Sequence, residues 1–500
     1  MRGVYILRNG SFVIRLGRFV IVVRGAGPYN FLGAAGGMKQ RQNDNGICDP
    51  EPTKMETNMY QINMQKLADE ASFNRFHAKV LLWCLLILVI DGYDIAVVGI
   101  ALPAIMKQMD ANASTAGIMA SSALFGMMFG AMALGTLSDR IGRRWALSIG
   151  VMLFSVFTAA AGFTKDPVSF SVVRFIAGLG IGGVLPVIVA QMVEYSPKKI
   201  RSLMTALMAS GYALGGILAA VLGKQLIGEY GWQVVFIAAG VPVLLIPFIL
   251  KLMPESMTYL ISHRRSGELA EVARHLQPEV KQPSDAQFVV STTDHVAGAP
   301  VTRLFQDGRG LSTVLFWIAF FSGLFMVYAL SSWLTKLMAL SGYSLGSALS
   351  FVIALNVGAI IGAVGGGWLA DKFRIKWVLV AMYALGGVLL YMMTLQASTE
   401  VRYLVIGAVG ACTTGAQLLA YAYCGQFYPM SIRSTGIGMA SGVGRLGAIA
   451  APLLIGQIVA LELPLEQNFL VIGAFGVIGA VALALISHGG LASQPIPQNA

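Results

Sequence analysis

Twelve apolar runs, each long enough to cross a lipid bilayer, restrict the folds that this chain can adopt. Crossing the hydrocarbon core takes about 20 residues of helix, and backbone groups there must be satisfied within helices or a closed barrel. The chain is 56% hydrophobic and 12% charged, whereas soluble proteins are roughly 25% charged. The runs span about 79–106, 115–137, 145–163, 169–195, 202–226, 232–253, 311–337, 344–369, 376–396, 401–425, 436–461 and 468–487. We therefore predict an all-α polytopic membrane protein with twelve transmembrane helices.

A polar segment at 254–310 divides the runs into two sets of six, which predicts two six-helix bundles joined by a linker. Within this segment, mixed charged and apolar residues from Ser266 to Leu276 predict a surface helix. Much of residues 1–58 is expected to be disordered or an over-extended translation start. The expected parts are an N-terminal segment (1–75), a first bundle (76–253), the linker (254–310), a second bundle (311–487) and a tail (488–500).

The net charge of +11 does not indicate nucleic-acid binding, because the basic residues gather in short loops between apolar runs. Such clusters mark cytoplasmic loops under the positive-inside rule. They follow the second, fourth and eighth runs: Arg140, Arg143, Arg144, Lys198, Lys199, Arg201, Lys372, Arg374 and Lys376. Both termini are therefore expected in the cytoplasm, with the lipid bilayer as a partner and no nucleic acid.

Nothing in the sequence indicates a metal, a cofactor or an enzyme active site. The four cysteines show no metal-ligand spacing, and three of them lie in apolar runs. Gly178, Gly180 and Gly183 spell GxGxxG, but a dinucleotide site needs a preceding strand, and these glycines lie inside an apolar run. Since no P-loop motif appears, ATP is not expected to drive the protein.

An internal repeat supports the division into two bundles. Gly135–Arg140 (GTLSDR) reappears as Gly367–Lys372 (GWLADK), and Pro197–Ser202 reappears as Pro429–Ser434. Both copies are offset by 232 residues. A shared offset predicts parallel structural repeats, the arrangement of secondary transporters that rock one bundle against the other.

Two carboxylates, Asp91 and Asp94, interrupt the first apolar run near its centre. Insertion scales put one Asp there at about 2.5 to 3.5 kcal/mol, so such acids normally face a protein-lined cavity or an ion pathway. The i, i+3 spacing puts both on one helix face. Burial and mutual repulsion favour the protonated form of a carboxyl group, so we expect proton exchange here. The alternative is a structural pair held by a basic residue or by backbone N–H groups.

Two arginines are also expected inside the membrane. Arg445 lies about nine residues into the eleventh run, at the depth of Asp91 and Asp94. A buried guanidinium needs an anion. We expect that anion to be one of those aspartates in the empty protein and the carboxylate of the substrate in the loaded protein. The alternative is a permanent ion pair within the protein. Arg174, in the outer part of the fourth run, either reaches the membrane surface or lines the access path.

Several motifs resemble the major facilitator superfamily. Gly135–Arg144 (GTLSDRIGRR) matches its signature G-x-L-x-D-R-x-G-R-R, and Pro254-Glu255-Ser256 is a second mark. Asp91-Gly-Tyr-Asp94 looks like the D-G-x-D of the aromatic acid:proton symporter family, with benzoate-type carriers the most similar. The resemblance implies the major facilitator fold and a monomer in the bacterial inner membrane. Asp371-Lys-Phe-Arg374 departs from the signature, so that copy is expected to latch more weakly.

The same resemblance implies a set of gating residues at the cytoplasmic ends of the helices. Carboxylate–guanidinium hydrogen bonds there would link neighbouring helices in the outward-facing state and break on inward opening. The residues are Gly135, Asp139, Arg140, Gly142, Arg143, Arg144, Glu194, Arg201, Asp371 and Arg433. The alternative is that the arginines only determine topology.

Polar and aromatic side chains in the second bundle suit an aromatic ring. Stacking and an amide hydrogen bond would orient an aryl acid, although each side chain alone is also compatible with helix packing. With the two arginines, the expected substrate residues are Tyr328, Asn356, Gln417, Tyr421, Arg174 and Arg445. We predict a symporter that imports an aromatic carboxylate with protons. The alternatives are a dicarboxylate or other organic acid, an exporter, and a membrane receptor that senses aromatic acids without moving them.

Overall fold

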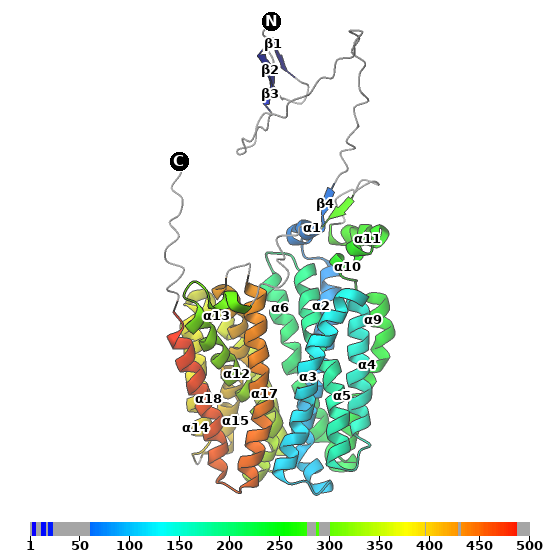
Figure 1. Ribbon diagram of the computed structural model, residues 1–500. Coiled ribbons are helices and arrows are strands. Elements are labelled where there is room, and N and C mark those ends of the chain that lie inside the picture. Colours follow the sequence, from blue (N-terminus) through cyan, green and yellow to red (C-terminus); the bar gives the residue numbers. More distant parts are fainter. Residues whose placement is uncertain are drawn as a thin grey trace. The chain divides into compact units, whose positions relative to one another are not determined.

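The computed structural model (Figure 1) describes residues 3–6, 12–16, 19–23, 61–277, 287–289, 301–395, 397–428 and 432–487. The chain forms two compact units, Met1–Asn58 and Met59–Ala500. The first contains the antiparallel sheet β1 (Gly3–Ile6), β2 (Phe12–Leu16) and β3 (Phe19–Val23). This sheet is not anticipated above, although alternating β-branched and aromatic residues favour strands. The expectation of disorder for residues 24–58 lies outside the described residues.

The second unit holds the helical bundles. Its first half consists of α2 (Arg75–Gln108), α3 (Ala113–Ile141), α4 (Arg143–Ala161), α5 (Pro167–Tyr195), α6 (Arg201–Ala209), α7 (Gly211–Tyr230), α8 (Gln233–Ala238), η1 (Val241–Leu245) and α9 (Ile246–Leu252). The fifth predicted span is broken at Ser210, between α6 and α7. The sixth is broken into α8, η1 and α9, where Pro242 and Pro247 each remove a backbone donor.

The second half repeats this arrangement. It consists of α12 (Gly310–Leu340), α13 (Leu345–Lys372), α14 (Ile375–Met392), α15 (Thr399–Gly410), the π-helical turn η3 (Ala411–Gly415), α16 (Ala416–Phe427), α17 (Arg433–Ala460) and α18 (Leu465–Leu485). Among the described residues, twelve helical segments are long and apolar enough to cross a membrane. The predicted fold, twelve transmembrane helices in two six-helix bundles, is therefore confirmed.

Polar caps fix where the helices begin. Asn74 caps α2 by accepting from the backbone N–H groups of Phe76 (2.9 Å) and His77 (3.3 Å), and Asp166 caps α5 immediately before Pro167. An oxygen at this position satisfies N–H groups that have no partner inside the helix.

We call the end of the bundles where α2 and α12 begin the near end, and the opposite end the far end.

Glycines bring neighbouring helices into backbone contact. A Cβ at Gly126 or Gly130 of α3 would collide with the carbonyl oxygens of Phe175 and Leu179 on α5. On the α5 side, Gly178 would meet the carbonyl oxygen of Ala123. Small residues on both helices allow this spacing, as in other membrane helix pairs. The glycines of the GxGxxG triplet thus serve helix packing.

A small layer covers the near end of the first half. It comprises α1 (Met64–Glu70), α10 (Met257–Ser262), α11 (Ser266–Leu276) and the parallel pair β4 (Gln61–Asn63) and β5 (Gln287–Val289), with η2 (Val301–Phe305) preceding α12. The surface helix predicted at Ser266–Leu276 is confirmed with the same bounds. Asn74 donates its side-chain N–H to the carbonyl oxygen of His275 at 2.9 Å, which ties α2 to this linker helix.

The two halves contact each other at the far end. Gln457 of α17 donates to the Ser114 hydroxyl of α3 at 2.7 Å, and Ser121 donates to the carbonyl oxygen of Ile449 at 3.1 Å. Lys224 of α7 donates to the Ser350 hydroxyl of α13 at 3.1 Å. These three hydrogen bonds join the halves across two helix pairs, α3 with α17 and α7 with α13, beyond the middle of the bundles.

Candidate functional site

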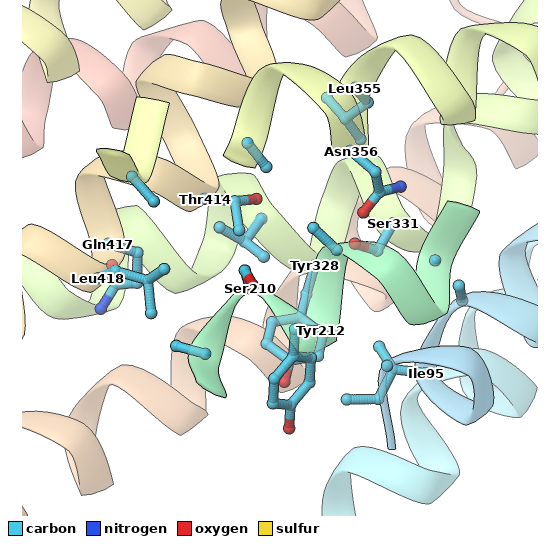
Figure 2. A pocket seen from close by; sticks show the side chains of 18 of the residues that line it. Ile95, Ser210, Tyr212, Tyr328, Ser331, Leu355, Asn356, Thr414, Gln417 and Leu418 are labelled. Atoms are coloured by element: carbon cyan, nitrogen blue, oxygen red, sulfur yellow. The ribbon is translucent and has the colours of Figure 1, made fainter. Parts of the chain in front are cut away.

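A cavity of about 170 Å³ lies between the two halves (Figure 2). One water molecule needs roughly 15 Å³ on the same measure, so the space is large enough for a small organic molecule. The first half contributes residues of α2, α5, α6 and α7, and the second half contributes residues of α12, α13, η3, α16 and α17. A chamber walled by both halves is positioned to respond when one half moves against the other.

Five of the six predicted substrate residues line this cavity. Tyr328 lies on α12, Asn356 on α13, Gln417 and Tyr421 on α16, and Arg445 on α17. Residues that are distant in sequence thus line one cavity.

Arg445 is the cation of the cavity wall. Its side chain is half-buried. Within the described part of the chain it forms no ion pair. The expected pairing of Arg445 with an aspartate in the empty protein is therefore not what the structure shows. The guanidinium faces a chamber where an anionic ligand can pair with it.

Asp91 lies directly behind the cavity wall. It is fully buried, and its Oδ2 accepts a hydrogen bond from the Tyr212 hydroxyl at 2.6 Å. Tyr212 itself lines the cavity, whereas Oδ1 of Asp91 has no hydrogen-bond partner among the described residues. Gly92 makes this contact possible, because a Cβ there would collide with the α7 backbone at Tyr212. One side chain thus separates this carboxyl group from the chamber.

Asp94 has different surroundings. Arg174 of α5 donates to both of its carboxylate oxygens, at 2.9 and 3.1 Å, and Thr158 of α4 donates to Oδ1. The Arg174 guanidinium also lies 6.0 Å from the ring centroid of Phe236. Asp91 and Asp94 do not share one environment, because Asp91 packs against α7 whereas Asp94, one turn further along α2, packs against α4 and α5.

The structure corrects both expectations for Arg174. Its side chain is 1% exposed, so it neither reaches a surface nor lines the cavity. A guanidinium inside a bundle pairs with the nearest buried anion. For Arg174 of α5, that anion is Asp94 of α2 rather than a substrate carboxylate. The sequence alone does not predict this pair, because the rotation of α5 depends on its close glycine contacts with α3 and α4.

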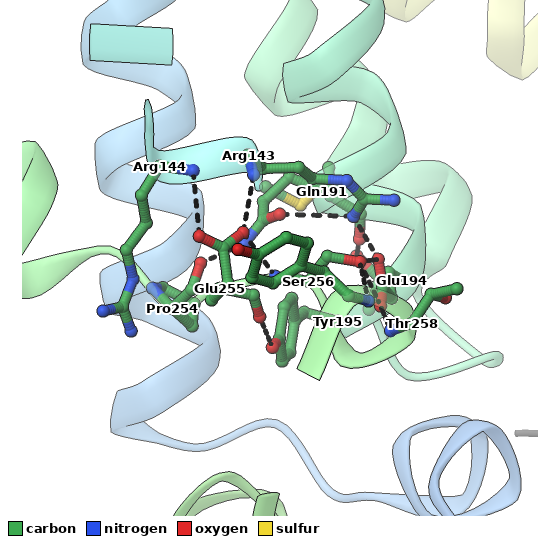
Figure 3. A network of polar contacts seen from close by, with 12 residues as sticks. Arg143, Arg144, Gln191, Glu194, Tyr195, Pro254, Glu255, Ser256 and Thr258 are labelled. Carbon is green, nitrogen blue, oxygen red and sulfur yellow. Dashed lines mark hydrogen bonds and ion pairs between the residues drawn. The ribbon is translucent and has the colours of Figure 1, made fainter. Parts of the chain in front are cut away.

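A second polar cluster at the near end contains part of the predicted gating set (Figure 3). Arg143 forms an ion pair with Glu194, and its guanidinium also donates to Gln191 at 3.2 Å. The backbone N–H groups of Arg143 and Arg144 donate to the carboxylate of Glu255, at 2.6 and 3.4 Å. Arg143, Glu194 and Gln191 belong to the first half, and Glu255 lies at the start of the linker, so in this conformation the cluster connects helices of one bundle to each other and to the linker.

Glu255, in the Pro254-Glu255-Ser256 motif, has a structural role that the sequence did not predict. Gly142, at φ 92°, ends α3 and turns the chain so that α4 begins with its free N–H groups facing this carboxylate. Tyr195 donates to the carbonyl oxygen of Glu255 at 2.5 Å. A signal was available: an acid that follows the sixth span can neutralise the positive end of a neighbouring helix.

The other gating residues are placed differently. Arg201 pairs with Asp69 of α1 rather than with Glu194, and Arg140 is exposed. Within the predicted gating set, Glu194 thus pairs with Arg143, while Arg201 contacts the near-end layer. The side chains at four further positions lie outside the described part of the structure: Gly135, Asp139, Asp371 and Arg433.

The described part of the chain contains no set of side chains arranged as metal ligands. No group of three or more His, Cys, Asp or Glu side chains there is arranged to hold an ion. Three cysteines, Cys84, Cys412 and Cys424, are buried as free thiols, and Cys48 lies outside the described residues. The polar chemistry of this protein is concentrated in the chamber and in the near-end cluster.

Comparison with known proteins identifies relatives over most of the chain. Residues 84–367 match the model of the Major Facilitator Superfamily. The chain is 40% identical to the benzoate transport protein of Acinetobacter baylyi, covering 85% of this chain and 93% of that protein. It is 34% identical to the gentisate transporter of Corynebacterium glutamicum (80% and 85%) and 31% identical to a 4-hydroxybenzoate transporter of Pseudomonas putida (85% and 97%).

Solved structures share the fold at low sequence identity. The xylose transporter XylE of E. coli superposes with a TM-score of 0.65 at 18% identity, covering 82% of this chain and 97% of that one. A bacterial homologue of the human lysosomal transporter Spinster gives 0.62 at 17%, covering 85% and 100%. The relatives are transporters, which confirms that the chain is not an enzyme. The chain belongs to the major facilitator superfamily and, within it, to the aromatic acid transporter family.

Proposed function

We propose that this protein imports an aromatic carboxylate together with protons, by alternating access across the bacterial inner membrane. One observation carries the proposal: a cavity between the two halves has in its wall the cation Arg445, which forms no ion pair with any described residue, and the buried acid Asp91 lies immediately behind that wall. An anion and a proton therefore have neighbouring binding groups in a single chamber.

The substrate class follows from the cavity and from the relatives. The lining combines Tyr328 and Tyr421 with aliphatic side chains, a surface suited to a flat ring. Relatives at 30–40% identity are named as transporters of benzoate, gentisate, gallate and 4-hydroxybenzoate. Among the described lining residues, Arg445 is the single cation, which favours a monocarboxylate over a diacid such as muconate.

In the proposed cycle, the substrate carboxylate binds Arg445 through two parallel hydrogen bonds. A proton on Asp91 removes the negative charge that would otherwise repel the incoming anion. Tyr212, which donates to Asp91 and faces the cavity, connects the two events. Loading both partners leaves the chamber nearly neutral, so the halves can rock without moving net charge through a low-dielectric barrier.

Energetics set the driving force. A monoanion carried with one proton is electroneutral and uses the pH gradient alone. Each additional proton adds about 2.3 kcal/mol per 100 mV of membrane potential. Proton release to the higher-pH cytoplasm would then return Asp91 to its charged state and favour substrate release.

The proposal includes topology and assembly. Both termini and the linker at 254–310 lie in the cytoplasm, because the basic loops belong to the near end, and the protein acts as a monomer of two bundles with the domain limits given above. In this orientation the far-end contacts, such as Gln457 with Ser114, close the periplasmic side.

Uptake into proteoliposomes tests the function. Purified protein should accumulate labelled benzoate or hydroxybenzoates when the outside is acidic, and imposed voltage should add to uptake only if more than one proton moves per substrate. Competition by muconate stronger than by benzoate would favour the diacid alternative. Saturable binding of aromatic acids without any transport would identify a receptor instead.

A further inference from the structure

The side-chain amide of Gln417 is held from behind the cavity wall. Tyr383 of α14 donates its hydroxyl hydrogen to Gln417 Oε1 at 3.1 Å. The same hydroxyl lies 3.3 Å from the carbonyl oxygen of Ala319, so the amide oxygen is the nearer acceptor. A hydroxyl that donates to Oε1 leaves Nε2 as the free end of the amide.

Tyr383 has little freedom to move. Its side chain is fully buried, and a Cβ at Gly479 of α18 would collide with its ring at 2.5 Å. A Cβ at Gly323 of α12 would overlap both the Tyr383 hydroxyl oxygen and Gln417 Oε1. Two glycines on two helices thus leave room for this hydrogen bond and for little else.

The fixed amide leaves one hydrogen-bonding group unused. Gln417 is only 5% exposed, and its Nε2 has no partner among the described residues. A buried N–H without an acceptor is unfavourable. Gln417 lines the cavity, so an occupant can supply the missing acceptor.

The local backbone brings this residue to the chamber. Gln417 follows the π-helical turn η3, whose Thr414 lines the same cavity. A π turn adds a residue and shifts the phase of the helix, and such turns are frequent at functional sites. One turn further on, the hydroxyl of Tyr421 is within 3.1 Å of Ser441 on α17, so Gln417 lies at about the depth of Arg445 on antiparallel neighbours.

We propose that Gln417 presents a fixed N–H donor to a substituent on the aromatic ring, and that Tyr383 is the residue that positions it. The site then prefers aromatic acids whose ring carries a hydrogen-bond acceptor, such as a hydroxyl oxygen or a ring nitrogen. Ring amino groups, which mainly donate, are disfavoured. This inference rests on the proposed function, with the carboxylate held by Arg445.

Competition against labelled benzoate in proteoliposomes tests the preference. The competitors are 3- and 4-hydroxybenzoate, the pyridine carboxylates and 3- and 4-aminobenzoate. In the wild-type protein, one hydroxyl or pyridine isomer should compete roughly tenfold better than the matching amino compound, the scale of one buried hydrogen bond. Tyr383→Phe removes only the hydroxyl, frees the amide to rotate and should reduce that ratio to about one.

A matched control separates positioning from general loss of a tyrosine hydroxyl. Tyr403 donates to the carbonyl oxygen of Ser347 at 3.3 Å in the same half and does not line the cavity. Tyr403→Phe should keep the wild-type ratio. Gln417→Met removes the donor at similar volume and should also reduce the ratio to about one. This variant tests the inference even if Tyr383→Phe folds poorly.

Each other outcome contradicts the inference. If Gln417→Met weakens benzoate and its hydroxylated and aminated analogues equally, the amide binds the carboxylate. If Tyr383→Phe keeps the wild-type ratio between the hydroxyl or pyridine compound and the matching amino compound, Tyr383 does not fix the orientation of the Gln417 amide. Uptake of benzoate with no ranking among ring substituents overturns this inference and leaves the proposed function standing, whereas absence of any aromatic acid transport removes both.

Discussion

Asp91 and Asp94 are the same residue type on the same helix, and their neighbours give them different chemistry. Asp94 lies in a buried ion pair with Arg174, while Asp91 accepts from one neutral donor, Tyr212, and its other oxygen has no partner among the residues that the structure describes. Protonating Asp94 would leave a buried guanidinium without its anion, which is costly. Protonating Asp91 leaves no such charge, so we assign the proton to Asp91.

Asp91→Asn is expected to abolish uphill accumulation because the amide cannot exchange a proton. Exchange of internal for external substrate, which needs no net proton movement, should continue at a substantial fraction of the wild-type rate. Labelled-benzoate accumulation and counterflow in proteoliposomes measure the two activities. Accumulation at the wild-type level would contradict the assignment.

For Asp94, the single variants should lower the stability of the protein, and the double variant should restore it. Asp94→Asn or Arg174→Gln leaves one buried charge unpaired and should cost about 3 to 5 kcal/mol of stability. The double variant removes both charges and should recover folding and pH-driven accumulation. Thermal unfolding in detergent and uptake measure these effects. A double variant that folds but cannot accumulate substrate would make Asp94 a second proton carrier.

Arg445→Lys keeps the charge and removes the planar fork. Because an ammonium group cannot form two parallel hydrogen bonds to one carboxylate, KM should rise about tenfold, the scale of one charge-assisted hydrogen bond. Substrate-dependence of initial uptake measures this, with Lys336→Arg as a control because Lys336 is absent from the cavity lining. An unchanged KM would remove Arg445 from the substrate site.

Residue patterns predicted the cavity better than the contacts around it. Polar residues at membrane depth, such as Asn356 and Arg445, need a chamber or partner in any fold, so their convergence was predictable from depth alone. The partner of Asp94 and the role of Tyr212 depended on how α5 and α7 are rotated in the bundle. Glycines bring α7 into close contact with α2, and α5 into close contact with α3 and α4. The sequence alone does not identify the partners of these glycines.

At the scale of elements, the junction between α3 and α4 shows how a loop motif works. Gly142 lets the chain turn at φ 92°, and Glu255, from beyond the sixth span, accepts from the first N–H groups of α4. The carboxylate also offsets the positive end of the helix. Through this contact, the loop motif between α3 and α4 connects the start of α4 to the segment that follows α9.

Glu255→Gln should destabilise this junction, because an amide oxygen accepts a weaker hydrogen bond than a carboxylate and carries no charge. The expected loss is about 1 to 2 kcal/mol of unfolding free energy. Melting in detergent measures it. Glu466→Gln, at an exposed position in the first turn of α18, is the control and should change little. Equal effects of the two substitutions would contradict a capping role.

For the whole molecule, alternating access requires the far-end contacts to break. Gln457 lies 2.7 Å from Ser114 across the halves, whereas Gln233 and Gln108 make a similar contact within the first half, at 2.9 Å. The first contact must open during a cycle, but the second need not. The fold itself was predictable from twelve apolar runs and a shared repeat offset, while the closed end depends on packing between halves.

A cross-link should therefore distinguish the two contacts. Cysteines at Ser114 and Gln457, joined by a short bifunctional maleimide, should reduce uptake at least tenfold. The matched pair at Gln108 and Gln233 should leave uptake nearly unchanged after the same treatment. Mass spectrometry verifies both cross-links, and transport by a fully cross-linked Ser114–Gln457 pair would exclude rocking about the cavity.

The central claim is that cargo and protons move together through one chamber, and direct recording of proton flux tests it. Proteoliposomes with a pH-sensitive dye inside, at equal internal and external pH, receive an inward gradient of hydroxybenzoate; protein-free and Asp91→Asn vesicles account for passive permeation of the acid. We predict acidification of the lumen in proportion to labelled substrate taken up, well above both controls. Uptake by the wild-type protein with no proton influx beyond those controls would contradict the account.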